Sequence, residues 1–230
     1  MTLHQQRQVE IINQIEQQIA TNSLQATAVV PVNDFDSDNR ICLTSIHFPQ
    51  AQYVNSIYSS ISEPLMKVFP EAYYYSPSSL HLTIKNIQVI DNPPTFSESE
   101  IEIAKKIFSF IIPQHHTFTI YPYRLLIFKN NIALMSTTDE ELDNIILDLD
   151  CELERAGLPD NKKYANKQYF FSNMTLARFS TIPPKLFIEK VRELSSLLTI
   201  PAYRVDSVSL ISSNAVMKKM NLHGKWNLLI

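Results

Sequence analysis

The 230-residue sequence has no paired cysteines, no cluster of basic residues and no long apolar run. Its only cysteines, Cys42 and Cys151, are far apart and have no C-x-x-C partner, which is typical of small apolar side chains in a reducing compartment. No stretch approaches the roughly 18 to 20 apolar residues of a membrane span. Residues 1–18 are rich in Gln and lack the apolar core of a signal peptide. We therefore expect a cytoplasmic protein that has no contact with a membrane.

The charge of the chain is nearly balanced. Twenty Lys and Arg residues against 23 Asp and Glu residues give a formal net charge of −3 at pH 7. Proteins that bind duplex DNA normally present a basic face, so this balance argues against a duplex DNA partner. A small nucleotide or an RNA end needs only one or two cations, and such a partner remains open. No motif sets an oligomeric state, and we expect a monomer.

Hydrophobic periodicity predicts an N-terminal helix, a polar connector and then alternating strands and helices. We expect residues 1–39 to form the helix and connector, and residues 40–230 to form one domain with two lobes. Helices are predicted over 3–21, 51–68, 98–112, 138–157 and 183–198. Strands are predicted over 41–48, 80–90, 117–128, 132–136, 169–179, 203–211 and 225–230.

Two of these helices carry signals at their ends or within them. Thr138 followed by Glu141 fits a capping box, which predicts that a helix opens at Thr138. Gly157, with Pro159 just beyond it, is a plausible left-handed cap for the same helix. Pro64 interrupts the helical pattern of residues 51–68.

The most informative pattern is a pair of similar short motifs. Residues 81–84 read His-Leu-Thr-Ile, and residues 173–176 read Asn-Met-Thr-Leu. In a regular strand, residues two apart share a face, so His81 and Thr83 would point one way, and Asn173 and Thr175 would do the same in the second copy. Two such strands side by side predict a cleft with a polar floor.

The paired motifs resemble those of the 2H phosphoesterases, the group that includes RNA 2′,3′-cyclic phosphodiesterases and 2′-5′ RNA ligases. The second motif continues as Leu-Ala-Arg through Arg178, as it often does in that family, and differs only in having Asn173 where the family has histidine. The resemblance covers residues 40–230. It implies an α+β fold, with two pseudo-symmetric lobes of antiparallel sheet and outer helices around a central cleft.

The chemistry of phosphodiester cleavage explains why such a cleft would hold two histidines. One group must take a proton from the attacking oxygen and another must give a proton to the leaving oxygen, and imidazole does both near neutral pH. Threonine hydroxyls such as those of Thr83 and Thr175 can donate hydrogen bonds to the phosphate oxygens. We expect no cofactor and no metal, because no set of His, Asp and Cys has ligand spacing, and His115 and His116 are adjacent.

Asn173 departs from the family pattern at the position that matters most for catalysis. An amide can hydrogen-bond to a phosphate oxygen, but it does not exchange a proton at pH 7. Losing one general acid or base typically costs about 10² to 10⁴ in rate. A slow enzyme, an enzyme with a substitute group and a pure binder all fit this loss. A substitute proton donor near Asn173 would favour the enzyme, whereas an apolar wall there would favour the binder.

Several further residues are candidates for the cleft. Lys85 would lie on the cleft face if its strand is regular, and could then neutralise phosphate. Arg178 is out of phase with Asn173 and Thr175, so it reaches the cleft only if the strand twists or bulges. The candidates to replace the missing histidine are His47, His115 and His116, and those to stack a base are Tyr73, Tyr74, Tyr75 and Tyr169.

The sequence therefore predicts a metal-independent phosphodiesterase-like protein. It would act on 2′,3′-cyclic phosphate or 2′-5′ linkages of RNA ends or small nucleotides, with weakened activity. His81, Thr83 and Thr175 are the predicted catalytic residues, and Asn173, Lys85 and Arg178 are predicted to bind the substrate. A non-catalytic module that binds nucleotides or RNA ends is the alternative, and a scaffold with a vestigial cleft is a third possibility.

Overall fold

A computed structural model of the chain describes residues 1–164, 166 and 168–230. The helical elements are α1 (Leu3–Ala20), α2 (Ala51–Ile57), the π-helical turn η1 (Tyr58–Ser62), α3 (Glu63–Met66), α4 (Glu98–Ile111), the 3₁₀ turn η2 (Ile112–Gln114), α5 (Glu141–Arg155) and α6 (Lys185–Ser196). The strands are β1 (Ile41–His47), β2 (Tyr73–Tyr74), β3 (Leu82–Asp91), β4 (Phe118–Ile127), β5 (Asn131–Thr138), β6 (Ser172–Arg178), β7 (Tyr203–Val205), β8 (Ser207–Ser213) and β9 (Met220–Asn227).

Two antiparallel sheets form two lobes. One sheet has the strand order β3-β1-β8-β9 and the other has the order β2-β6-β5-β4-β7. The first motif leads into β3 and the second lies in β6, so each sheet carries one motif, and β3 and β6 contact one another between the lobes. The expected α+β class with two antiparallel lobes is confirmed.

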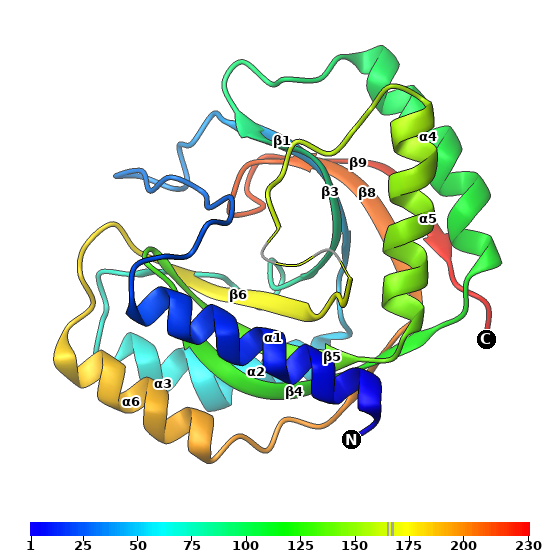
Figure 1. Ribbon diagram of the computed structural model, residues 1–230. Coiled ribbons are helices and arrows are strands. Elements are labelled where there is room, and N and C mark those ends of the chain that lie inside the picture. Colours follow the sequence, from blue (N-terminus) through cyan, green and yellow to red (C-terminus); the bar gives the residue numbers. More distant parts are fainter. Residues whose placement is uncertain (165, 167) are drawn as a thin grey trace.

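Helices cover the outer sides of both sheets (Figure 1). Helices α4 and α5 pack together beside β9 and β3, while α1 contacts β5 and α6 contacts β4 on the other lobe. The two lobes share one core, because Ile87 of β3 and Phe108 of α4 belong to the same buried cluster as Leu176 of β6 and Phe187 of α6. The apolar faces of both sheets are therefore buried together. No helix in the described part of the chain is both long and apolar enough to span a bilayer.

Helix α1 is anchored to the second lobe by apolar packing and by one buried amide. Ile11, Ile12 and Ile15 pack in a small cluster with side chains of β4 and β5. The Gln8 side chain is fully buried, and its Nε2 donates to Thr138 Oγ1 at 2.7 Å. Gln8 Oε1 accepts from the backbone N–H of Thr138 at 2.8 Å. The amide of Gln8, at the centre of this contact, therefore has both of its hydrogen-bonding groups paired with Thr138 of β5.

The structure corrects the predicted start of α5. Thr138 is the last residue of β5, and the helix begins at Glu141 with Glu140 as its N-cap and no side-chain cap. The hydroxyl of Thr138 instead accepts the hydrogen bond from Gln8. The predicted end is confirmed, since Gly157 has a φ of +77° just after the helix. The Thr138 hydroxyl therefore hydrogen-bonds to Gln8 of the N-terminal helix and does not cap α5.

Other boundaries shift without changing the order of the main elements. The segment around Pro64 stays helical because the π-turn η1 lies just before it and absorbs the break in the hydrogen-bond pattern. The strand expected over 203–211 is divided into β7 and β8, which belong to different sheets. The last strand begins at Met220, before the expected residue 225.

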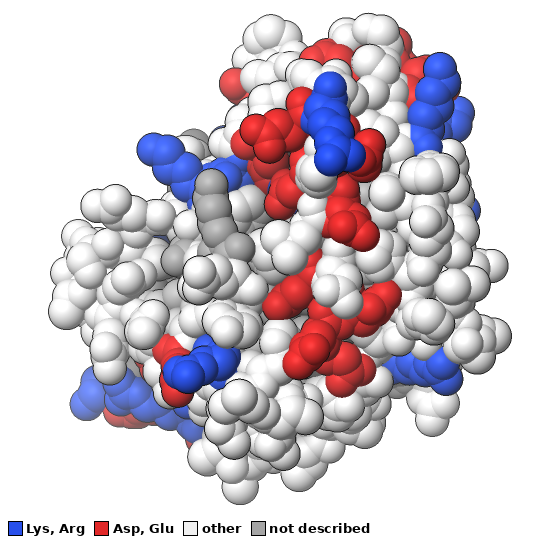
Figure 2. All heavy atoms as spheres, turned by 45° about the vertical axis from the view of Figure 1, so that its right-hand side comes forward, with Lys and Arg blue, Asp and Glu red and all other residues white. Residues whose placement is uncertain are grey.

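One face of the molecule is acidic. Figure 2 shows Asp and Glu side chains gathered in a band on the side where α5 comes forward. The acidic residues of this helix that are not buried are Glu141, Asp148, Asp150, Glu152 and Glu154. A band of this sign gives this face of the molecule a negative potential that repels anions.

Candidate active site in the cleft between the lobes

Two adjoining cavities lie where the two motif strands meet. The larger has a volume of about 320 Å³ and contains His81, Arg178 and Cys42 in its wall. The smaller has a volume of about 110 Å³ and contains Asn173 and a group of aromatic residues. Thr83, Asn86 and Lys162 line both cavities. The first motif thus reaches the larger cavity and the second motif the smaller one, with three polar residues at their junction.

His81 is held in one tautomer. It lies just before β3, is 7% exposed, and its Nδ1 is 2.8 Å from the carbonyl oxygen of Ser79. A carbonyl only accepts hydrogen bonds, so Nδ1 carries the proton and Nε2 of the neutral ring has a free lone pair. Burial, together with the charge of Arg178, lowers the pKa of His81 to about 4. The ring is therefore neutral at pH 7 and has the form of a general base.

A β-bulge in β3 decides which side chains face the cleft. Ser45 pairs with Lys85 and Ile46 pairs with Thr83, so Ile84 is an extra residue in β3. Ile84 and Lys85 are both buried, and the next residue on the half-buried cleft side after Thr83 is Asn86. The strand is thus not regular here, and Asn86 occupies the place beside Thr83 that the sequence assigned to Lys85.

Lys85 lies outside both cavities. Its side chain is 1% exposed, and its Nζ forms an ion pair with Asp160 and lies 2.6 Å from Asp150 Oδ1 on α5. This amine is already matched by carboxylates, so it has no free charge for a ligand. Its ion pair with Asp160 instead links β3 to the segment after α5.

A second bulge brings Arg178 into the cleft. Ala133 of β5 pairs with Thr175 and Ile132 pairs with Ala177, so Leu176 is an extra residue in β6. Leu176 and Ala177 are both buried in succession, after which Arg178 returns to the half-buried face of Asn173 and Thr175. The bulge that the sequence required for Arg178 to reach the cleft is present.

Arg178 is fixed by a buried tyrosine. Its Nε donates to the Tyr75 hydroxyl at 2.8 Å, and its guanidinium lies 5.9 Å from the centre of the Tyr75 ring. The same ring is 5.9 Å from the imidazole of His81. Tyr75 therefore holds the guanidinium and the imidazole on one side of the larger cavity.

The two polar residues of the second motif, Asn173 and Thr175, do not share a cavity as His81 and Thr83 of the first motif do. Asn173 lines the smaller cavity. Thr175 lies between Asn173 and Arg178 on the same half-buried face of β6, but it lines neither cavity. Of the four residues predicted as a polar floor, His81 therefore lines the larger cavity, Asn173 the smaller one and Thr83 both, while Thr175 lines neither.

Lys162 is a site residue that sequence analysis did not identify. It lies in the segment between α5 and β6, where no periodic pattern marks it, and reaches the cleft because this segment folds back over β3. Two side-chain contacts hold the segment there: Asn161 Oδ1 accepts from the backbone N–H of Val89, and Asn161 Nδ2 donates to Gln88 Oε1, both at 2.7 Å. Burial lowers the pKa of Lys162 to about 8.

The polar connector before β1 forms part of the wall of the larger cavity. Residues 27–30 line it. The backbone N–H of Thr27 donates to the Lys163 carbonyl at 3.0 Å, and the Lys163 N–H donates to Thr27 Oγ1 at 2.8 Å. Two segments distant in the sequence thus meet at the wall of the larger cavity.

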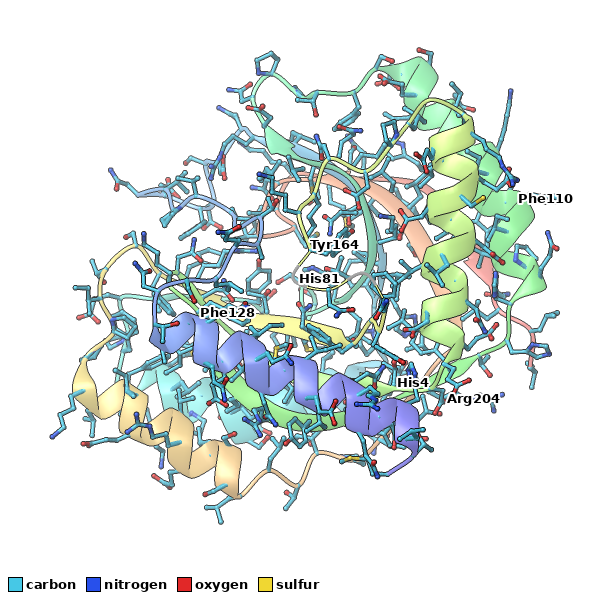
Figure 3. All side chains as sticks on the ribbon, viewed as in Figure 1. His4, His81, Phe110, Phe128, Tyr164 and Arg204 are labelled. Carbon is cyan, nitrogen blue, oxygen red and sulfur yellow. The ribbon has the colours of Figure 1, made fainter. Side chains whose placement is uncertain are left out.

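The aromatic candidates are divided between the smaller cavity and the core. Tyr169 lines the smaller cavity with Tyr164, Phe170 and Phe171. Figure 3 shows His81 and Tyr164 in the middle of the molecule between the sheets. Tyr73 and Tyr74 lie in β2 and line neither cavity.

The histidines considered as substitutes lie away from the cleft. His47 Nδ1 is 2.8 Å from the Ser207 carbonyl oxygen. His115 packs against α5, with Nδ1 3.0 Å from Glu141 and Nε2 3.2 Å from Asp148. His116 is exposed near the start of β4. In the described residues, no group of three or more His, Cys, Asp or Glu side chains is arranged to hold a metal ion.

Comparisons with known proteins give matches in structure only. No protein-family model and no curated protein matches the sequence. A crystal structure of a phosphoesterase matches with a TM-score of 0.55 and 16% identity, covering 84% of this chain and 100% of that one. LigT of E. coli complexed with 3′-AMP matches with a TM-score of 0.53 and 16% identity, covering 83% of this chain and 99% of LigT.

A third structure extends the likeness. A conserved protein of unknown function, ATU0111 from Agrobacterium tumefaciens, matches with a TM-score of 0.57 and 12% identity, covering 92% of this chain and 99% of that one. All three likenesses cover more than four fifths of this chain and nearly the whole of the other chain. At these identities they establish the architecture, and the resemblance that the paired motifs indicated is confirmed at that level. The protein has the fold of the LigT-like 2H phosphoesterases.

Proposed function

We propose that the protein is a metal-independent phosphodiesterase that acts on the 2′,3′-cyclic phosphate or 2′-5′ linkage of a small nucleotide or an RNA end. The observation that carries the proposal is that a neutral His81 and the guanidinium of Arg178 line the same cavity. The imidazole offers a lone pair at Nε2 and the guanidinium offers a fixed positive charge. Together they supply a general base beside a phosphate site.

The residues at the junction of the cavities suit the oxygens of a phosphate. The Thr83 hydroxyl and the Asn86 amide can donate hydrogen bonds, and Lys162 adds a second positive charge. Asn173 would orient the phosphate from the smaller cavity, and Thr175 would support it from the same strand. Phosphodiester cleavage develops negative charge on these oxygens, so donors fixed in the cleft stabilise the transition state.

The size of the cleft favours a short substrate. The larger cavity is about 320 Å³, which is within the range of small-molecule sites, and residues 27–30 form part of its wall. LigT of E. coli has been crystallised with 3′-AMP, with ATP and with NADP⁺, and these are all small nucleotides. The aromatic wall of the smaller cavity offers faces on which a nucleobase could stack.

Hydrolysis of a substrate panel in the presence of EDTA tests this proposal. The panel contains 2′,3′-cyclic nucleotides and 2′-5′-linked dinucleotides. His81→Asn keeps a hydrogen-bond donor but removes the base, and His116→Asn is the matched control because His116 is exposed outside the cleft. We expect turnover that falls by about 10²-fold or more in His81→Asn and is unchanged in His116→Asn.

A non-catalytic module is the second candidate, and Asn173 favours it because an amide exchanges no proton. The same panel separates the two functions. Nucleotide binding measured by calorimetry, with no hydrolysis at high protein concentration, would establish the module and reject the phosphodiesterase. Hydrolysis that persists in His81→Asn would also reject the assignment of His81 as the base.

A further inference from the structure

The proposed phosphodiesterase lacks a proton donor at the second motif. His81 supplies a base, and Asn173 stands where a second acid-base group is needed. A substitute must lie in the smaller cavity or at its junction with the larger one, and it must carry a proton at neutral pH. The titratable side chains among the described residues that line the smaller cavity are Lys162, Tyr164 and Tyr169.

Tyr164 is already committed elsewhere. Its hydroxyl donates to Asp160 Oδ2 at 2.5 Å, and burial beside this carboxylate raises its pKa. It therefore holds its proton more tightly than a free phenol. Tyr169 lies at the aromatic end of the cavity and lines only the smaller space. Neither hydroxyl is placed at the junction that both motifs share.

Lys162 is at that junction, since it lines both cavities together with Thr83 and Asn86. Its Nζ lies 5.0 Å from the centre of the Tyr164 ring. The backbone around it is fixed, because the Lys162 N–H donates to Asp160 Oδ1 at 2.6 Å and Lys163 is hydrogen-bonded to Thr27. The lysine is thus carried by a segment that is anchored on both sides of the cleft.

The carboxylate closest in sequence, Asp160, forms its ion pair with Lys85 and not with Lys162. Asp160 accepts from Lys85 Nζ and from the Tyr164 hydroxyl. Within the described part of the chain, no carboxylate lies within ion-pair distance of Lys162 Nζ. Burial lowers the pKa of Lys162 to about 8, even though the negative charge of Asp160 raises it; the positive charges of Lys85 and Arg178 lower it further.

We propose that Lys162 is a catalytic residue that donates the proton which the second histidine would otherwise supply. This role rests on the proposed phosphodiesterase function. It follows from Lys162 lining both the cavity that contains His81 and the cavity that contains Asn173, and from the ion pair of the neighbouring Asp160 with Lys85.

The reaction balances with water as the only co-reactant. His81 Nε2 takes a proton from water as its oxygen bonds to phosphorus, and the bond from phosphorus to one ribose oxygen of the cyclic ester breaks. Lys162 Nζ gives a proton to that leaving oxygen, so the product is a phosphomonoester. The imidazolium then releases its proton to solvent and the neutral amine takes one up. The group with the low pKa begins as the base and the group with the high pKa begins as the acid, as the step requires.

Two substitutions separate proton donation from charge. Lys162→Arg keeps a positive charge but does not release a proton near neutral pH, whereas Lys162→Met removes both. Lys163→Met is the matched control, because Lys163 is exposed and is held by its backbone. The readouts are kcat for a 2′,3′-cyclic nucleotide from pH 5 to 10 and the Kd of the corresponding 3′-nucleotide.

We expect kcat to fall by about 10²-fold or more in both Lys162 variants and to stay unchanged in Lys163→Met. The 3′-nucleotide should bind Lys162→Arg as it binds the native protein, and bind Lys162→Met more weakly. The native activity should fall above a pH near 8, and this alkaline limb should be absent from the residual activity of Lys162→Arg. Adding Asn173→His to Lys162→Arg should restore at least 10-fold in kcat.

The failures of the two proposals can be told apart. A native protein that hydrolyses nothing would overturn the phosphodiesterase and with it the donor role. A native protein that turns over, with Lys162→Arg retaining both the native kcat and the alkaline limb, would overturn the donor role alone. Circular dichroism and thermal unfolding of each variant confirm that the folded protein is being compared.

Discussion

Arg178 Nε donates a hydrogen bond to the Tyr75 hydroxyl across 2.8 Å, and that hydroxyl donates in turn to the carbonyl oxygen of Ala215. Tyr75 comes just after β2, Arg178 ends β6 and Ala215 follows β8, so this chain of bonds joins the two lobes. The ring of Tyr75 is fully buried. The position of the guanidinium in the cleft therefore depends on one hydroxyl.

Tyr75→Phe should weaken nucleotide binding and lower the free energy of unfolding. The substitution leaves the Ala215 carbonyl and the guanidinium without a partner, which typically costs about 1 to 3 kcal/mol. Urea unfolding and calorimetry measure the two effects. Tyr73→Phe is the control, because the Tyr73 hydroxyl donates to the exposed Asp36 and its loss should cost less than about 1 kcal/mol. Equal effects of the two substitutions would contradict the bridging role of Tyr75.

Lys85→Met should destabilise the protein strongly without touching the cleft directly. Removing the amine leaves Asp160, whose side chain is 7% exposed, as a buried charge without its partner. Breaking a buried pair in this way typically costs about 3 to 5 kcal/mol.

The measurement is urea unfolding, with Lys105→Met as the control, since the exposed pair of Lys105 and Glu102 is worth about 1 kcal/mol or less. Combining Lys85→Met with Asp160→Asn should recover part of the loss, because it removes the unpaired charge. A double variant that is no more stable than Lys85→Met would show that the charge of Asp160 is not the cause.

The stability of the protein should fall as the pH is lowered, with His81 as one contributor. The pKa of His81 is about 4 in the folded protein, below the value near 6.5 of an unfolded chain, so between these values the unfolded state binds more protons. His81 therefore does not reduce the free energy of unfolding above a pH of about 6.5. As the pH falls from there toward 4, protonation of His81 in the unfolded state lowers the free energy of unfolding. The full contribution is on the order of 3 kcal/mol.

The contribution of His81 is isolated by a difference. The pKa of Asp143 is raised to about 6 by burial, so Asp143 favours the folded state in acid and opposes the trend. We therefore compare the unfolding free energies of the native protein and of His81→Asn from pH 4 to 7.5. The contribution of Asp143 is the same in both proteins, so it cancels in their difference. We expect the difference to change with pH between 4 and 6.5, and a constant difference would mean that His81 titrates normally.

Gln8→Ala should loosen the contact of α1 with the second lobe. It removes the acceptor for the buried N–H of Thr138 and the donor to the Phe170 carbonyl, at an expected cost of about 1 to 3 kcal/mol. Hydrogen exchange of the β5 amides and urea unfolding report this loss. Gln6→Ala, on the exposed side of the same helix, should leave both unchanged. Faster exchange in Gln6→Ala as well would show that the buried hydrogen bonds of Gln8 are not the cause, because alanine does not lower helix propensity.

Local patterns in the sequence predicted the elements well where one face is buried. The apolar spacing of α4 and α5 and the left-handed Gly157 depend only on nearby residues, so they could be recognised without the fold. The capping box at Thr138 was wrong because a residue 130 positions away takes its hydroxyl. A local signal fails where a distant partner competes for the same group.

For the candidate site, the sequence by itself determined the two motifs and the missing histidine at Asn173. Which side chains meet the cleft was decided only by tertiary structure. One extra residue at Ile84 turns Lys85 away, and one at Leu176 turns Arg178 inward, because a single inserted residue reverses the alternation of a strand. Lys162 enters from a segment without periodicity, held by contacts to β3 and to the connector. Strand register and loop placement depend on pairing between distant residues, and no short stretch of sequence encodes them.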